Sequence, residues 1–133
     1  MKIISLLMKN ARIPKTKIAE KLNVTETAIR KRISKLEKDG VIIGYKAVIN
    51  YKTAGLSASL TGIDVEPDKL WDVIEKLKKI DEIKSIYLTT GDHMLMLEIV
   101  EKTVDDLSKI HEKISKLKGV KRICPAIILD VLK

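Results

Sequence analysis

The sequence has no phenylalanine and no glutamine, only one cysteine among 133 residues, and an aromatic content of 3%. A single cysteine, Cys124, excludes an internal disulfide framework and is typical of a protein from a reducing compartment. We therefore expect a cytoplasmic protein. Because aromatic residues are scarce while 45% of the residues are apolar, its core must be built from isoleucine, leucine, valine and methionine.

Long apolar runs are missing as well. No stretch approaches the ~18 apolar residues that a membrane-spanning helix needs. The first residues, MKIISLLMKN, contain too short an apolar stretch for a signal peptide and no small-residue cleavage site. We therefore expect no membrane partner.

Catalytic and metal-binding patterns are also absent from the sequence. It contains no phosphate-binding loop, and His93, His111 and Cys124 lack the spacing of metal ligands. Glu98 and Glu101 are most simply interpreted as surface charges at the end of a strand. We therefore expect that the protein is not an enzyme and uses no metal and no cofactor.

The net charge of +8 is unevenly distributed along the chain. Residues 1–50 hold 12 Lys and Arg against 4 Asp and Glu, whereas residues 51–133 hold 14 of each kind, so the whole excess lies in the first part. A positive segment joined to a neutral one is typical of a chain whose first part binds phosphate and whose second part has another task. A solvated basic surface would explain the charge equally well, so charge alone does not decide.

Residues 16–40 predict two short helices joined by a tight turn, which form a helix-turn-helix over about Lys17 to Leu36. Apolar residues recur at helical spacing in both halves, at Ile18, Ala19 and Leu22 and then at Ala28, Ile29, Ile33 and Leu36. Thr25 is placed to cap the second helix, because its hydroxyl can accept a hydrogen bond from a first-turn amide. Gly40 is placed to end that helix, because glycine enters the left-handed conformation at little cost.

The second helix of such a motif lies in the major groove of double-stranded DNA, with its first residues at the base edges. The side chains that we predict to contact bases or phosphates are Lys15, Lys17, Thr25, Thr27, Arg30, Lys31, Arg32, Lys35 and Lys46. The residues expected at base edges are Thr25, Thr27, Arg30 and Lys31, whereas Lys15, Lys17, Lys35 and Lys46 are expected at phosphates, which position the protein without reading sequence.

Two arginines of this helix differ in what is expected of them. Arg30 is the expected base reader, because a guanidinium can pair with both acceptors of a guanine. Arg32 has two interpretations of equal weight: it contacts DNA, or it braces the domain internally against Glu37 or Glu20.

The stretch after Gly40 predicts a small ribbon and then a linker. Residues 41–43 and 45–49 are interpreted as two short strands that turn near Gly44, which together would form the wing of a winged helix. Residues 51–55 are interpreted as a linker. The first domain is therefore expected to be a winged helix-turn-helix.

The spacing of apolar residues in 56–133 differs from that in the first part and predicts a second domain. Four strands are expected at residues 56–65, 83–90, 94–100 and 120–131, with one helix opening at Pro67 and another capped by Thr103. The order βαββαβ is that of a ferredoxin-like fold. The predicted fold class is therefore α+β, with a winged helix-turn-helix domain in residues 1–50, a linker in 51–55 and a ferredoxin-like domain in 56–133.

Two of the predicted strands contain residues that are apolar on both faces, Met94 to Leu97 and Ala126 to Leu129. A βαββαβ unit covers only one face of its sheet with helices, and no spare helix is left to cover the other face. A bare apolar face usually marks a partner site. We therefore expect a homodimer in which two such sheets pack together.

Several short motifs of the chain are similar to those of one known family. In the first domain they are Ala11-Arg12, Ile18-Ala19, Arg32-Ile33, Leu36-Glu37, Gly40-Val41-Ile42 and Gly44-Tyr45, and in the second they are Gly91 and Leu117-Lys118-Gly119-Val120. On these residues, nearly the whole chain resembles the Lrp/AsnC, or feast/famine, transcription regulators. The resemblance implies dimers that assemble into larger oligomers, and an effector, often an amino acid, that binds near the turn after the second strand.

In this chain the effector turn would contain Gly91, Asp92 and His93. The family often has an Asp three residues after that glycine, whereas here the third residue is Met94 and the acid is Asp92. A polar hairpin turn without a ligand remains the other interpretation. The function expected is a sequence-specific transcription regulator, with two alternatives: an architectural DNA-binding protein without effector control, or a ferredoxin-like sensor or enzyme with an incidental basic module.

Overall fold

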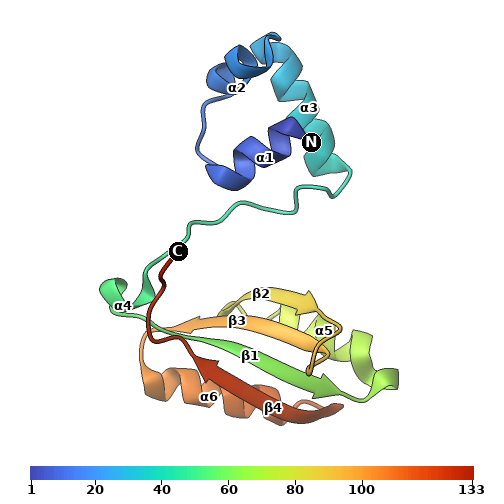
Figure 1. The fold of residues 1–133 in the computed structure, drawn as a ribbon. Helices are drawn as coiled ribbons and strands as arrows, with labels where there is room; N and C mark the ends of the chain where they lie inside the picture. The colour runs from blue at the N-terminus through green and yellow to red at the C-terminus, as the bar shows by residue number, and fades with distance from the viewer. The chain divides into compact units, whose positions relative to one another are not determined.

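The computed structural model describes all residues from 1 to 133, and the chain divides into two compact units, residues 1–48 and residues 49–133. The first unit consists of helices, and the second contains a sheet with its own helices (Figure 1). None of the helices is both long and apolar enough to cross a membrane.

The helical unit contains α1 (Lys2–Lys9), α2 (Lys15–Leu22) and α3 (Glu26–Lys38), and α2 and α3 form the predicted helix-turn-helix. Its core is apolar throughout and consists of Ile3, Ile18, Ala19, Ile29 and Ile33, with partly buried neighbours around them. Since these residues recur every three or four positions, each helix buries one stripe and leaves the opposite stripe to solvent.

Local chemistry fixes both ends of α3 as the sequence predicts. Asn23 adopts a left-handed conformation (φ 55°) between α2 and α3, which asparagine tolerates better than most residues. The Oγ1 atom of Thr25 accepts a hydrogen bond from the Ala28 amide at 3.1 Å and so caps the helix. Gly40 (φ 74°) follows the last turn, and the amide of Val41 donates to the carbonyl oxygen of Leu36 at 2.9 Å.

The predicted wing is not formed, because no residue between 41 and 49 belongs to a strand. The side chains of Ile43 and Val48 are 94% and 81% exposed, so little of this segment's apolar surface packs against the helices. An isolated two-stranded ribbon is marginal in water without a third strand or a packed face. The expectation of a ribbon turning near Gly44 is therefore wrong for this structure.

The segment interpreted as a linker contains a short helix. Residues Tyr51–Ala54 form the short helix α4. The Oδ1 atom of Asn50 accepts a hydrogen bond from the Thr53 amide at 3.0 Å, and Gly55 ends the helix with a φ of 73°. An N-cap and a left-handed C-terminal glycine therefore bracket a single helical turn, which was not predicted from the sequence.

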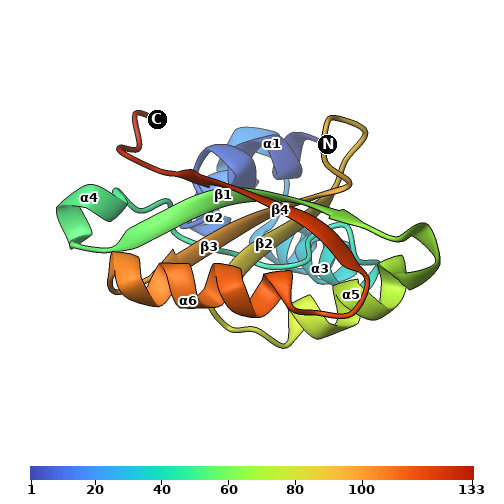
Figure 2. The ribbon, with the colours of Figure 1, turned by 90° about the horizontal axis from the view of Figure 1, so that it is seen from below.

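The second unit is a four-stranded antiparallel sheet with helices on one face, which confirms the predicted ferredoxin-like fold (Figures 1 and 2). The strands are β1 (Ser57–Val65), β2 (Ile83–Leu88), β3 (Leu95–Glu101) and β4 (Val120–Ile127), in the spatial order β2-β3-β1-β4. The helices are α5 (Leu70–Lys78), which follows a 3-10 turn (Pro67–Lys69), and α6 (Val104–Ser115). The last strand ends four residues earlier than predicted, at Ile127.

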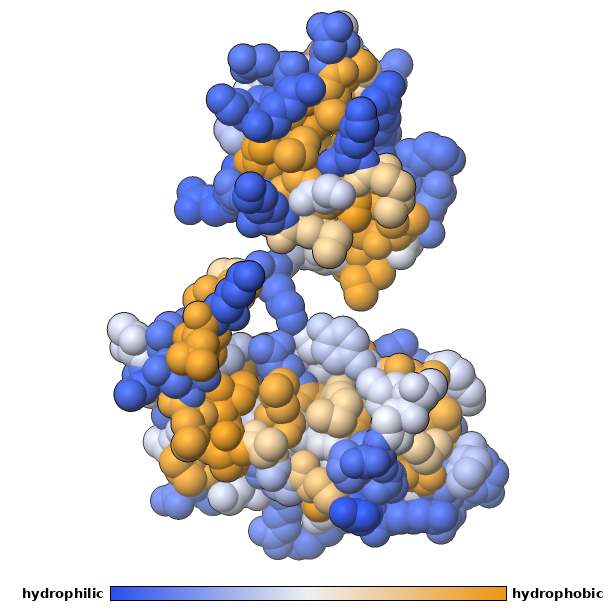
Figure 3. All heavy atoms as spheres, in the orientation of Figure 1, coloured by the Kyte–Doolittle hydropathy of each residue, from blue (hydrophilic) through white to orange (hydrophobic).

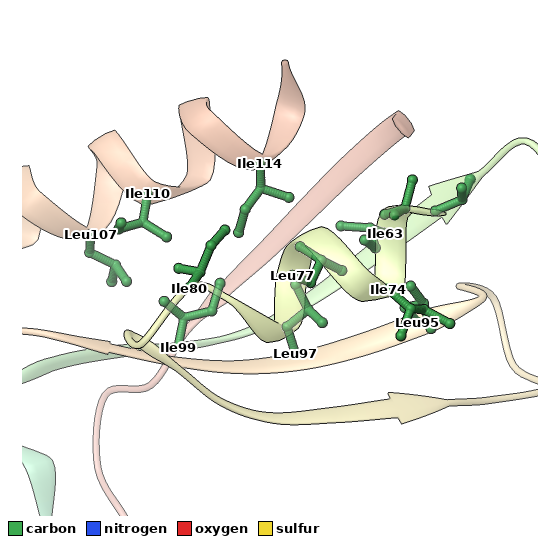
Figure 4. Close-up of a cluster of buried hydrophobic side chains, with 12 residues drawn as sticks. Ile63, Ile74, Leu77, Ile80, Leu95, Leu97, Ile99, Leu107, Ile110 and Ile114 are labelled. Carbon is green, nitrogen blue, oxygen red and sulfur yellow. The ribbon is translucent and has the colours of Figure 1, made fainter. Parts of the chain in front are cut away.

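The core of the second unit lies between the sheet and its two helices (Figure 4). The most buried residues are Ile63, Val65, Val73, Leu77, Leu95, Leu97, Ile99, Leu107 and Ile114, none of them more than 1% exposed. Because side chains alternate along a strand, the residues between these on β1 and β3 point to the opposite, open face of the sheet.

Two polar residues of β1 are also buried in the core side of the sheet. Ser59 and Thr61 are both 0% exposed, and their hydroxyl oxygens lie 2.8 Å apart. The Nε2 atom of His111 on α6 lies 2.8 Å from Ser59 Oγ and 3.2 Å from Thr61 Oγ1. This polar cluster satisfies its own hydrogen bonds, and burial lowers the pKa of His111, so the imidazole is neutral near pH 7.

Candidate DNA-binding surface and effector turn

The outer stripe of α3 lies opposite its buried residues. Thr27, Lys31, Ser34 and Lys38 follow one another at intervals of three or four residues, which places them on one face, and all four are exposed. Ile29 and Ile33 hold the other face in the core. Figure 3 shows hydrophilic side chains projecting over much of the surface of the helical unit. The helix thus presents two cations and two hydroxyls in a row.

Arg30 lies beside this stripe and forms an ion pair with Glu26. Its Nη2 atom is 2.6 Å and its Nε atom 3.1 Å from the same carboxylate oxygen, Oε1. The side chains of Arg30 and Glu26 remain 63% and 39% exposed. An exposed pair of this kind contributes about 0–1 kcal/mol, so its free energy does not prevent Arg30 from engaging another partner.

The remaining predicted DNA contacts surround α2 and α3 and are exposed. Lys15 and Lys17 lie in the first turn of α2, and Lys46 lies in the extended segment after α3. Lys35 pairs with Asp39 at 3.1 Å, again between exposed side chains. The structure therefore brings these cations onto the helical unit without burying any of them.

Arg32 does not brace the domain in the way that one interpretation of the sequence allowed. Its side chain is exposed and forms no ion pair with Glu20 or Glu37. The carboxylate of Glu37 instead accepts a hydrogen bond from the Tyr45 hydroxyl at 3.2 Å. Burial and this carboxylate both raise the pKa of Tyr45, so its hydroxyl stays protonated as a donor.

Tyr45 also borders a small cavity within the helical unit. The cavity has a volume of about 250 Å³ and is lined by Leu7, Ala11, Ile13, Lys15, Ile33, Glu37 and Tyr45. The contact between Tyr45 and Glu37 attaches the start of the extended segment to α3, next to Lys46.

The three residues of the predicted effector turn differ in exposure and in their contacts. Gly91 and Asp92 are exposed at the tip of the hairpin between β2 and β3. His93 folds back instead, and its Nδ1 atom lies 3.3 Å from Asp64 Oδ2 on β1. The Thr89 hydroxyl donates to the carbonyl oxygen of His93 at 2.6 Å, which fixes the backbone of the turn.

His93 occupies space that a side chain at position 62 would need. Gly62 lies in β1 beside the imidazole, and a Cβ atom built there would lie only 2.2 Å from Cδ2 and 2.4 Å from Cγ of His93. Neither Gly62 nor Asp64 was predicted to lie beside the turn. A glycine in the middle of a strand was the available signal, because it often marks a close approach of another chain segment.

The open face of the sheet carries a carboxylate in its middle. Glu98 lies within β3 and accepts hydrogen bonds from Tyr51 Oη at 2.7 Å and from Ser85 Oγ at 3.0 Å. Burial and this carboxylate raise the pKa of Tyr51 to about 12. The interpretation of Glu98 as a strand-end surface charge is therefore wrong, because a cross-strand serine and a helical tyrosine surround it.

Around this carboxylate the open face is largely apolar. Leu60 lies opposite Glu98 on one side and Ala126 on the other, and Tyr87 lies opposite Met96. Leu60 is 48% and Tyr87 58% exposed, which is high for large side chains in a sheet. Figure 3 shows hydrophobic side chains at the surface of this unit among hydrophilic ones.

No group of three or more histidine, cysteine, aspartate or glutamate residues could hold a metal ion. Ser59 and His111 are in contact, but Ser59 is 0% exposed and cannot meet a substrate.

Comparisons with known proteins agree over the whole chain. A family model described as winged helix-turn-helix DNA-binding matches residues 1–43, and a model described as the Lrp/AsnC ligand binding domain matches residues 59–133. The HTH-type transcriptional regulator LrpA of Pyrococcus horikoshii is 47% identical over 133 residues, which cover 98% of this chain and 94% of that protein.

Two solved structures have the same fold. The leucine response regulatory protein LrpA of Mycobacterium tuberculosis superposes with a TM-score of 0.78 at 25% identity, over 99% of this chain and 91% of that one. A transcriptional regulator of Neisseria meningitidis, solved as a complex with L-Met, gives a TM-score of 0.71 at 20% identity, over 99% and 88% of the two chains. The chain therefore belongs to the Lrp/AsnC family of transcription regulators, and it joins a DNA-binding helix-turn-helix to that family's ligand-binding domain.

Proposed function

We propose that this regulator binds specific double-stranded DNA sites through residues 1–50 and uses residues 56–133 for dimerisation and effector binding. The observation that carries the proposal is the exposed row of cations and hydroxyls on α3, opposite its buried stripe. The excess of +8, which belongs entirely to residues 1–50, supports phosphate binding by the same unit.

In this proposal α3 enters the major groove. Thr25, Thr27, Arg30 and Lys31 lie in its first turns and face the base edges. The cations proposed to contact phosphates are Lys15, Lys17, Arg32, Lys35 and Lys46, which are exposed around the groove-facing helix. Arg32 joins this group because it has no internal carboxylate partner in Glu20 or Glu37.

The second part of the proposal is a homodimer formed by the open sheet faces. The exposed side chains of Leu60 and Tyr87 support it, because large apolar residues on an uncovered sheet face favour a partner. Pairing would set the distance between two copies of α3, so that a dimer addresses two half-sites about one helical turn of DNA, or a multiple, apart. Dimers of this kind would assemble further into a larger oligomer.

The third part is an amino-acid effector at the turn of Gly91, Asp92 and His93. A neighbour in the same fold was solved with L-Met, and a ligand-binding family model covers this part of the chain. The exposed Asp92 carboxylate would suit the ammonium group of an amino acid. The effector would act by favouring one assembly state over another.

The decisive experiment is selection of bound sequences from random duplex DNA by the full chain, repeated with an amino-acid mixture. A single enriched motif with two half-sites is expected, and its enrichment should change in the presence of the effector. Sedimentation velocity under both conditions measures the assembly state. If no sequence is enriched although the protein binds DNA, the architectural alternative is correct instead.

A further inference from the structure

Glu26 holds the side chain that is proposed to read a base. It lies in the first turn of α3, one turn before Arg30, and a single oxygen of its carboxylate accepts both the Nη2–H bond at 2.6 Å and the Nε–H bond at 3.1 Å. A long side chain that would otherwise sample many rotamers is thereby biased toward one position on the exposed surface of the helix.

The contact leaves the useful edge of the guanidinium free. Arginine has five N–H donors, and the Nε edge of Arg30 faces Glu26. Nη1 and the second hydrogen of Nη2 form the end of the fork, which is the geometry that pairs with O6 and N7 of guanine. A carboxylate on the side of the fork therefore orients its end and does not compete with the base.

Glu26 also has a cost for DNA binding in general. It is one of four acids among the first 50 residues, and it lies at the end of α3 that enters the groove first. A carboxylate near phosphates weakens binding to every sequence alike. Helix stability explains the pair poorly, because the side chains are 39% and 63% exposed and such surface pairs contribute little.

We infer that Glu26 is a positioning residue for sequence discrimination: it orients Arg30 toward guanine and increases the preference for a specific site while lowering affinity for all DNA. The inference rests on the proposed function, because it requires α3 to lie in the major groove. Specificity is a difference between two affinities, and a group that weakens the wrong complex more than the right one increases it.

The test uses the full chain with two duplexes, the site that the wild type enriches from random DNA and a scrambled duplex of the same composition. In Glu26→Gln, the affinity for the scrambled duplex should rise about twofold to fivefold, because one negative charge is removed. The ratio of the two affinities should fall about twofold to fivefold, since the exposed pair that orients Arg30 contributes no more than about 1 kcal/mol.

A matched control is available in the second unit. Glu112 and Lys116 form an exposed i,i+4 pair on α6 at 3.0 Å, and Glu112→Gln makes the same change in net charge. This variant should leave the ratio of affinities unchanged. In an Arg30→Ala background, Glu26→Gln should no longer alter the ratio, because the side chain that it orients is gone.

Two results would overturn the inference. The first is an unchanged ratio in Glu26→Gln with a wild-type helix content by circular dichroism. The second is a change of preference at one base pair that persists in the Arg30→Ala background, since Glu26 would then read a cytosine directly. If the wild type enriches no sequence, the proposed function is wrong, and so is the inference. If the wild type selects a site but the ratio of affinities is the same in Glu26→Gln, only the inference is wrong.

Discussion

The two units of this protein treat polar side chains in opposite ways. In the helical unit every buried residue is apolar, and charged groups such as Arg30 and Lys31 lie outside on α3. In the second unit, Ser59 and Thr61 are buried beneath α6 and are satisfied by His111. On α3 the hydrogen-bond donors are therefore available to an external partner. In the second unit the buried polar groups bond to one another, which fixes the position of α6 on the sheet.

The cores of the two units also differ in size. The helical unit buries five apolar residues, and the second unit buries a cluster of twelve. Because hydrophobic burial is the main stabilising contribution, the second unit should be the more stable of the two. The comparison separates a small unit with its charged side chains outside from a larger unit with a more extensive apolar core.

The largest effect is expected from breaking the larger core. Leu97→Ala removes a side chain that is 1% exposed between β3 and the helices, and it should lower the free energy of unfolding by about 2–5 kcal/mol. Urea unfolding followed by circular dichroism measures the loss. Leu88→Ala is the matched control on the same sheet, because Leu88 is 58% exposed and should change stability by no more than about 0.5 kcal/mol. Equal losses in the two variants would contradict the assignment of the core.

The next effect concerns DNA and belongs to the helical unit. Arg30→Ala should weaken binding to the selected duplex by about 1–3 kcal/mol, because a bidentate base contact is lost, and should weaken binding to unrelated DNA less. Fluorescence anisotropy with both duplexes measures the two losses. Lys116→Ala, which removes a cation just after the end of α6 in the neutral part of the chain, should affect neither strongly. A uniform loss on both duplexes would make Arg30 a phosphate contact only.

A smaller effect is expected from removing a threonine N-cap, which each unit has at one helix. Thr25 and Thr103 each accept a hydrogen bond from a backbone amide three residues ahead, both at 3.1 Å. Replacement of either by alanine should cost about 1 kcal/mol of stability, whereas serine should preserve most of it. Only Thr25→Ala should also weaken DNA binding, because α3 carries the predicted base contacts. Thermal unfolding together with a DNA titration checks both statements, and a DNA defect in Thr103→Ala would argue against the division of roles.

The smallest effect is the response to pH through His111. Its pKa is lowered from 6.5 by burial, so as the pH falls through that value the unfolded chain binds the proton first and the free energy of unfolding decreases. Above that pH the imidazole is neutral in both states and contributes no dependence. The helical unit contains no histidine, so this decrease belongs to the second unit.

His111→Gln tests the assignment, because glutamine can keep a hydrogen bond to Ser59 and does not titrate. Urea unfolding of wild type and variant at about pH 7.5 and about pH 5.5 should show a smaller loss of stability in the variant. The same loss in both proteins would mean that other groups control stability in this range.

The elements with strong periodicity were predictable from the sequence. Ile29 and Ile33 identify the buried stripe of α3, and Thr25 and Gly40 identify its ends, because each signal is local. The order of strands and helices in the second unit follows in the same way from alternation and from turn residues. These features depend on spacing within one segment, and spacing is what a single sequence displays.

Features that depend on contacts between distant segments were not predictable. Whether residues 41–49 form a ribbon depends on a surface to pack against, and Ile43 remains 94% exposed. The environment of Glu98 depends on Tyr51, which is 47 residues away along the chain. The pairing of His93 with Asp64 likewise spans β1 and the turn. The turn and the position of Glu98 could be identified from the sequence, whereas the residues that contact them could not.

The close packing of the His93 side chain on Gly62 limits which substitutions these two positions can accept during evolution. A Cβ atom at position 62 would lie 2.2 Å from Cδ2 of His93, so no residue larger than glycine is tolerated there while His93 keeps its place. Because the Cβ atom of His93 would itself lie 2.9 Å from a Cβ atom at position 62, only glycine at position 93 or a shift of the turn backbone would open room for alanine at position 62. Among relatives the two positions should therefore vary together, and the order of substitution along a lineage is constrained: position 93 must shrink before position 62 can grow.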